Sequence, residues 1–222
     1  MTTYFVSTDG VDSTRRNGRS PDTAWASLAY AGQRVPAGKN TIEIGSGTFV
    51  ATQSAYLKSG VTVVGAGRDQ NGTQIVASRN WKIARTAKKG DFDPDEYLIV
   101  LNQDNNVTIR DLTLASDPRH RITGALHSKK SDNTTVRDVA VQDFRWAGFH
   151  FEQASGLKIY NNYLKNASVE KHGYSNGLIR TRFIKDSDFY HNTIVSTVGT
   201  GYGYKGGGHE DVRIHHNYYS GN

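Results

Sequence analysis

Seven ionisable residues recur at matching positions in the second half of the chain. They are His127, Lys129, His150, Glu152, Arg180, Arg182 and Lys205. A guanidinium group binds a carboxylate through two parallel hydrogen bonds, and a lysine among other cations is favoured as the neutral amine that accepts a proton. Brought onto one surface, these residue types could bind an anionic group and transfer protons beside it.

A repeated apolar pattern indicates how these residues would meet. Five copies each contain an apolar residue and a second one ten positions later, and the copies begin 27, 23, 30 and 25 residues apart. The five pairs are Ile99 and Ile109, Leu126 and Val136, Phe149 and Ile159, Ile179 and Phe189, and Tyr204 and Ile214. A unit of this length cannot bury its apolar face alone, so the copies must stack, strand on strand. The sequence therefore predicts an all-β fold, a right-handed parallel β-helix.

Two columns of outward side chains follow from this stacking, because the neighbours of an inward strand residue point outward. The first column is Val100, His127, His150, Arg180 and Lys205, and the second is Asn102, Lys129, Glu152, Arg182 and Gly207. Successive strands lie about 4.8 Å apart, so the cations would form a dense strip with Glu152 as its one carboxylate. Like charges this close repel each other unless an anion lies between them. We therefore predict a surface that binds an anion.

Other segments support the same architecture. Asn162, Asn192 and Asn217 follow the second apolar residue by three positions in the last three copies, which predicts a ladder of side-chain amides. Residues 20–31 have Pro21 in a first turn and apolar residues at helical spacing, so we expect a short N-terminal helix that caps the stack. Residues 4–7, 41–44, 47–50 and 61–64 read as early strands, and residues 79–96 as a loop excursion. We expect one domain, residues 1–222.

Composition limits the other possibilities. A mean hydropathy of −0.60 excludes a membrane span, and the absence of cysteine excludes a disulfide framework. A formal net charge of +6 suits an anionic partner. Met1 is followed directly by a strand-like segment with no signal-peptide pattern, so the protein is either cytosolic or secreted with its signal already removed.

The longest copy places two more candidates near the strip. Because the first ten residues of every copy correspond, the extra length of the 30-residue copy falls in its return loop, residues 166–176. This loop leads into the strand of Arg180, so we expect His172 and Tyr174 at the edge of the strip.

The N-terminal segments Tyr-Phe-Val-Ser-Thr-Asp-Gly and Ser-Pro-Asp-Thr-Ala-Trp-Ala-Ser-Leu, the turn at Gly47, and the asparagine positions resemble the β-helical polysaccharide lyases. With a lysine in a glycine-rich copy, this short chain is most similar to the small alginate lyases of that group. The resemblance implies a Lys or Tyr and an Arg on the strand face, which Lys205, Tyr174, Arg180 and Arg182 could match. Some such lyases bind calcium through Asn and Glu, but only Glu152 could serve here, so we expect no cofactor.

The residues fit the same chemistry, the β-elimination of a uronate polymer such as alginate. We expect Arg180 to neutralise the substrate carboxylate and Lys205 and Tyr174 to transfer the protons, with the base and the acid unassigned between them and His150 in reserve. The other expected contacts to substrate are Arg182, Lys129, His127, Glu152, His172 and Tyr204. We expect a secreted monomer whose partner is an anionic polysaccharide and neither nucleic acid nor membrane.

Three alternatives remain. A glycosidase needs a pair of carboxylates, and the two columns supply only Glu152. A uronate epimerase abstracts the same proton without cleavage, and Gly-Phe-His-Phe-Glu-Gln at residues 148–153 faintly resembles a strand of such enzymes, although their Asp is absent. A non-catalytic carbohydrate-binding module would rely on exposed aromatic side chains.

Overall fold

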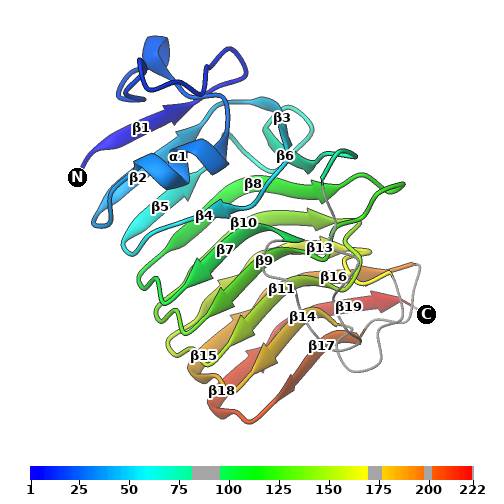
Figure 1. Cartoon of the computed structure of the whole chain (residues 1–222). Helices are drawn as coiled ribbons and strands as arrows, with labels where there is room; N and C mark the ends of the chain where they lie inside the picture. Colours follow the sequence, from blue (N-terminus) through cyan, green and yellow to red (C-terminus); the bar gives the residue numbers. More distant parts are fainter. Residues whose placement is uncertain (82–95, 170–176, 198–201, 222) are drawn as a thin grey trace.

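The computed structural model describes residues 1–81, 96–169, 177–197 and 202–221, and its strands coil into a parallel β-helix made of two sheets (Figure 1). The larger sheet has thirteen strands: β1 (Thr3–Val6), β2 (Asn40–Ile44), β3 (Gly47–Ala51), β5 (Val61–Val64), β6 (Thr73–Ala77), β8 (Thr108–Ser116), β10 (Thr135–Gln142), β12 (Lys158–Tyr160), β13 (Tyr163–Lys165), β15 (Lys185–Tyr190), β16 (Thr193–Ser196), β18 (Glu210–His215) and β19 (Tyr218–Gly221). The smaller sheet has six: β4 (Ala55–Tyr56), β7 (Tyr97–Asn102), β9 (Gly124–Lys129), β11 (Ala147–Glu152), β14 (Gly177–Arg182) and β17 (Tyr202–Gly207).

The two predicted apolar columns are confirmed by the strand register. In the smaller sheet the column runs in the order Ile99, Leu126, Phe149, Ile179 and Tyr204. Its first four members are at most 1% exposed, so they form the centre of the core. The second column runs from Ile109 to Ile214 through the larger sheet. Ile214 remains 42% exposed because β18 is the outermost strand of its sheet.

The predicted asparagine ladder is also present. Asn162 Nδ2 donates to Asn192 Oδ1 at 3.0 Å, and Asn192 Nδ2 donates to Asn217 Oδ1 at 3.0 Å. Each ladder residue follows a residue with left-handed φ and precedes a third strand, β13, β16 or β19, which the sequence pattern did not predict. These strands have three or four residues, which is too short for alternation to be recognised.

The N-terminal cap differs from the single helix predicted at residues 20–31. It divides into a 3-10 turn, η1 (Pro21–Thr23), and a helix, α1 (Leu28–Arg34). Between them Trp25 is extended, because its backbone N–H donates to Phe5 and its carbonyl accepts from Ser7. The helix α1 packs against β1 and β4 at the N-terminal end of the coil (Figure 1). No helix among the described residues is long and apolar enough to cross a membrane.

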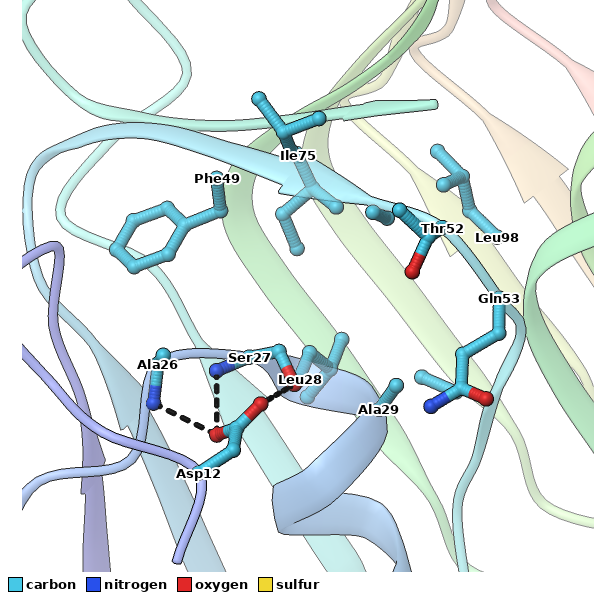
Figure 2. A pocket seen from close by; sticks show the side chains of 13 residues that line it. Asp12, Ala26, Ser27, Leu28, Ala29, Phe49, Thr52, Gln53, Ile75 and Leu98 are labelled. Carbon is cyan, nitrogen blue, oxygen red and sulfur yellow. Dashed lines mark hydrogen bonds between the residues drawn. The ribbon is translucent and has the colours of Figure 1, made fainter. Parts of the chain in front are cut away.

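A hollow of about 230 Å³ lies beside α1 and is lined mainly by apolar side chains, including Phe49, Ile75 and Leu98 (Figure 2). Its one carboxylate, Asp12, accepts hydrogen bonds from the backbone N–H groups of Ala26 and Ser27 and from the Ser27 hydroxyl. Asp12 therefore anchors the start of α1.

Candidate active site

The seven ionisable residues meet on the outer face of the smaller sheet, and we call them the charged strip. The register aligns His127, His150, Arg180 and Lys205 in one column on β9, β11, β14 and β17. Lys129, Glu152 and Arg182 form the parallel column two residues further on. Figure 1 shows these strands side by side along the lower half of the coil. The strand register therefore aligns the seven residues in two parallel columns, as the sequence predicted.

Burial divides the strip into two halves. His127 is 6% exposed and His150 is 0% exposed, although both point away from the core. Lys129 and Arg182 are exposed, whereas Arg180 and Lys205 are half-buried. Placement on the outward face therefore does not expose the two histidines to solvent. A polymer on the strip would contact the arginine and lysine end, not the His150 ring.

Tyr97 belongs to the enclosed half and was not among the predicted site residues. Alternation from Ile99 would turn Tyr97 inward, but Leu98 and Ile99 both lie in the core and Tyr97 lies outside it. Its ring stacks on His127 with centroids 5.2 Å apart, and its hydroxyl lies 3.4 Å from His150 Nδ1. Burial raises the pKa of Tyr97 well above its usual range, so the phenol remains protonated.

Tyr97 is positioned by the residues around it. A Cβ at Gly124, its partner on β9, would lie 2.2 Å from the Tyr97 ring, so only glycine leaves room for that ring. The residue before Tyr97 is Glu96, and its Oε2 accepts hydrogen bonds from Thr123 and from Arg145. Tyrosine facing glycine in adjacent copies is the sequence signal that could have revealed this contact.

The enclosed half contains one carboxylate contact. His150 Nε2 lies 3.2 Å from Glu152 Oε1, and this contact is the main reason why the pKa of Glu152 falls to about 2. Burial lowers the pKa of His150, so the imidazole is neutral. A proton on Nε2 would satisfy Glu152 and leave Nδ1 to accept from the Tyr97 hydroxyl. Tyr97, His150 and Glu152 therefore lie in a row, with the carboxylate next to the open half of the strip.

His127 makes the stability of the fold depend on pH. Burial and, to a smaller degree, His150 lower the pKa of His127 to about 3. As pH falls below the unfolded pKa of about 6.5, the unfolded chain gains a proton that the folded chain does not, so stability falls. At pH 5 the cost is about 2 kcal/mol. Glu152 adds only about 0.2 kcal/mol by pH 5, because its carboxyl group takes up protons mainly at lower pH.

We expect the free energy of unfolding to fall between pH 7 and pH 5 by about 2 kcal/mol more in the unmodified protein than in His127→Gln. Chemical denaturation at the two pH values measures this difference. The exposed His191 supplies the control, since His191→Gln should retain the full acid loss. An equal loss in His127→Gln and the unmodified protein would contradict a buried neutral His127.

The open half presents three cations over a groove of about 370 Å³. Arg180 and Arg182 lie on β14, and Lys205 lies beside Arg180 on β17. Burial lowers the pKa of Arg180, but from a range so high that the guanidinium stays charged. Lys205 Nζ lies 5.2 Å from the centre of the Tyr202 ring. The two guanidinium groups of this half can bind a carboxylate, and the primary amine of Lys205 lies on the neighbouring strand.

One predicted site residue, Tyr204, does not lie on this face. Tyr204 turns inward, where its ring packs on Phe189 and its hydroxyl lies 2.7 Å from Thr181 Oγ1. Burial raises the pKa of Tyr204 to about 12, as expected for a structural phenol. His172 and Tyr174 lie outside the described residues.

The residues of the strip do not fit a calcium ion. Calcium takes six to eight oxygen ligands, and Glu152, the strip's one carboxylate, contacts the neutral His150. Within residues 1–81, 96–169, 177–197 and 202–221, no three His, Cys, Asp or Glu side chains are grouped to hold a metal.

Comparisons with known proteins find similarity only among solved structures, since no family model and no curated protein matches the chain. A rhamnogalacturonan lyase matches with a TM-score of 0.65 and 12% identity over 100% of this chain and 62% of its own. A Parabacteroides merdae protein described as a glycosyl hydrolase matches with a TM-score of 0.56 and 12% identity, over 81% of this chain and 78% of that one.

The A-module of a mannuronan C-5 epimerase from Azotobacter vinelandii matches with a TM-score of 0.50 and 15% identity, over 79% of this chain and 52% of that one. The chain therefore spans less than two thirds of the lyase and of the epimerase module. At such low identity, the structural similarity shows a shared fold alone. It gives no specific support to the resemblance to the small alginate lyases. The chain therefore shares the parallel β-helix fold of these three proteins.

Proposed function

We propose that the protein binds a uronate-containing polysaccharide along the charged strip and cleaves it by β-elimination. The observation that carries the proposal is the open half of the strip, where two guanidinium groups and one amine lie on adjacent strands. Arg180 pairs directly with Lys205, and Arg182 faces Gly207, which has no side chain to block access. A uronate polymer offers one carboxylate per acidic sugar, which matches this charge.

The proposed reaction assigns a role to each of these groups. Arg180 and Arg182 bind the carboxylate and stabilise the negative charge that develops on it when the neighbouring C5 proton leaves. A base takes that proton. The electron pair of the broken C5–H bond forms the C4–C5 double bond, and the C4–O bond breaks. The leaving oxygen takes a proton from an acid. Lys205 supplies one of these two roles and Tyr174 the other.

We infer alginate as the substrate from the similarity of the N-terminal segments and the glycine-rich lysine copy to small alginate lyases. The charged strip lies within one chain, so a monomer suffices for this activity. An enzyme that degrades such a polymer would be secreted.

The test is to incubate the protein with alginate and, separately, with polygalacturonate, and to follow the ultraviolet absorbance of unsaturated ends. Absorbance growth with alginate supports the full proposal, and growth with polygalacturonate alone would replace the substrate. Solvent deuterium incorporated at C5 without absorbance would indicate the epimerase reaction instead. New reducing ends without absorbance would indicate hydrolysis and would overturn the proposal.

Arg180→Lys is expected to lower kcat/KM by about 10²-fold, because an ammonium group cannot reproduce the two parallel hydrogen bonds to a carboxylate. Steady-state kinetics on the substrate found above measures this loss. Arg213→Lys on β18 of the larger sheet is the matched control, since Arg213 is exposed and forms its ion pair with Asp188. Unchanged turnover in Arg180→Lys would remove Arg180 from the mechanism.

A further inference from the structure

An aromatic side chain stands beside the open half of the strip in a position that the fold does not require to be aromatic. Phe183 is the residue after Arg182 and is 50% exposed. The corresponding residues of the other copies are Gln103, Lys130, Gln153 and Gly208, and all five have left-handed φ between 51° and 72°. A bulky residue is disfavoured in this conformation. The turn therefore accepts a polar residue or glycine, and Phe183 is the exception.

The next copy leaves space around this ring. Glycine occupies three consecutive positions, 206–208, and together with Phe183, Arg180, Arg182 and Lys205 they line the groove. A Cβ at Gly208 would lie 2.3 Å from the Phe183 ring, so this glycine allows the ring to lie against the turn. A Cβ at Gly207 would have nothing within 4 Å, so that position opens directly into the groove.

The charges complete the groove's chemistry. The Arg182 guanidinium carbon lies 5.0 Å from the centre of the Phe183 ring, which brings a cation and an exposed aromatic surface together. A sugar ring carries apolar C–H groups on its faces, and a uronate also carries a carboxylate at its edge. An exposed aromatic ring beside two guanidinium groups is complementary to both features.

We propose that this groove is a binding subsite for a single uronate ring, with Phe183 contacting the sugar face and Arg180 and Arg182 binding its carboxylate. The subsite deepens the proposed function, on which it rests for the identity of the polymer. Because Gly207 has no side chain, it leaves the space that the sugar ring fills. Phe183 acts here as a substrate-binding residue and takes no part in proton transfer.

Binding of short oligouronates by isothermal titration calorimetry tests the subsite without requiring cleavage. Phe183→Ala should weaken binding on the order of tenfold. The matched control is Gln153→Ala, which shortens the side chain at the corresponding turn of the preceding copy, where φ is also 51°. Gly207→Leu should weaken binding at least as much while preserving the melting temperature, because the new side chain enters open space.

The outcomes separate the subsite from the cleavage reaction. Weaker binding in Phe183→Ala and Gly207→Leu, with Gln153→Ala unchanged, supports the subsite even if no unsaturated ends form, in which case only the proposed lyase activity fails. Cleavage by the unmodified protein with equal affinity in Phe183→Ala overturns the subsite and leaves the lyase intact. Failure of the unmodified protein to bind any oligouronate, or equal affinity for a neutral oligosaccharide, overturns the subsite as well.

Discussion

Replacing Lys205 by Ala is expected to lower kcat by about 10²–10⁴-fold, the loss typical of removing a positioned proton-transfer group. Lys205 lies on β17 beside Arg180, in the half of the strip that a polymer can reach. Its side chain is half-buried and makes no ion pair that the described structure shows, so the melting temperature should change little. Initial rates from the absorbance of unsaturated ends, together with thermal unfolding, measure both quantities.

Lys158→Ala is the matched control for this prediction. Lys158 is exposed on β12 of the larger sheet, away from the strip, so the same truncation there should leave kcat unchanged. If Lys205→Ala keeps full activity, proton transfer falls to another group. His150 was the reserve candidate, but it is fully buried between Tyr97 and Glu152, where it orients the carboxylate without reaching the polymer.

The register of this fold could be predicted from sequence because it repeats. The ten-residue offset fixes each inward residue, and period-two alternation then fixes its neighbours, so Arg180 was correctly placed beside Lys205. Alternation fails near the start of several of these strands, where consecutive residues such as Leu98 and Ile99 both lie in the core, and Tyr97 was missed for that reason.

Burial could not be predicted in the same way. Alternation states which face a side chain occupies but not what lies above that face, so His127 and His150 were taken as solvent-facing. The N-terminal helix was misjudged for a related reason. Trp25 fits a helical pattern, yet its backbone pairs with β1, an interaction between distant segments that no local pattern contains.

Phe149→Ala is expected to lower the free energy of unfolding by about 3–5 kcal/mol, because it removes a ring from the centre of the core. Phe149 is 0% exposed, lies between Leu126 and Ile179 in the inward column, and has its ring centroid 6.2 Å from that of Phe151. The stacked strands above and below hold the backbone in register, so the cavity cannot collapse completely. Chemical denaturation at pH 7 measures the loss.

Phe183→Ala provides the matched control, since it is the same truncation of a ring that is 50% exposed. Its stability loss should be about 1 kcal/mol or less, because little buried surface is removed. Phe149→Ala and Lys205→Ala should also differ in function. Below its lowered melting temperature Phe149→Ala should retain kcat, whereas Lys205→Ala should lose kcat without losing stability. A loss below about 1 kcal/mol in Phe149→Ala would mean that the inward column does not form the core that supports the strip.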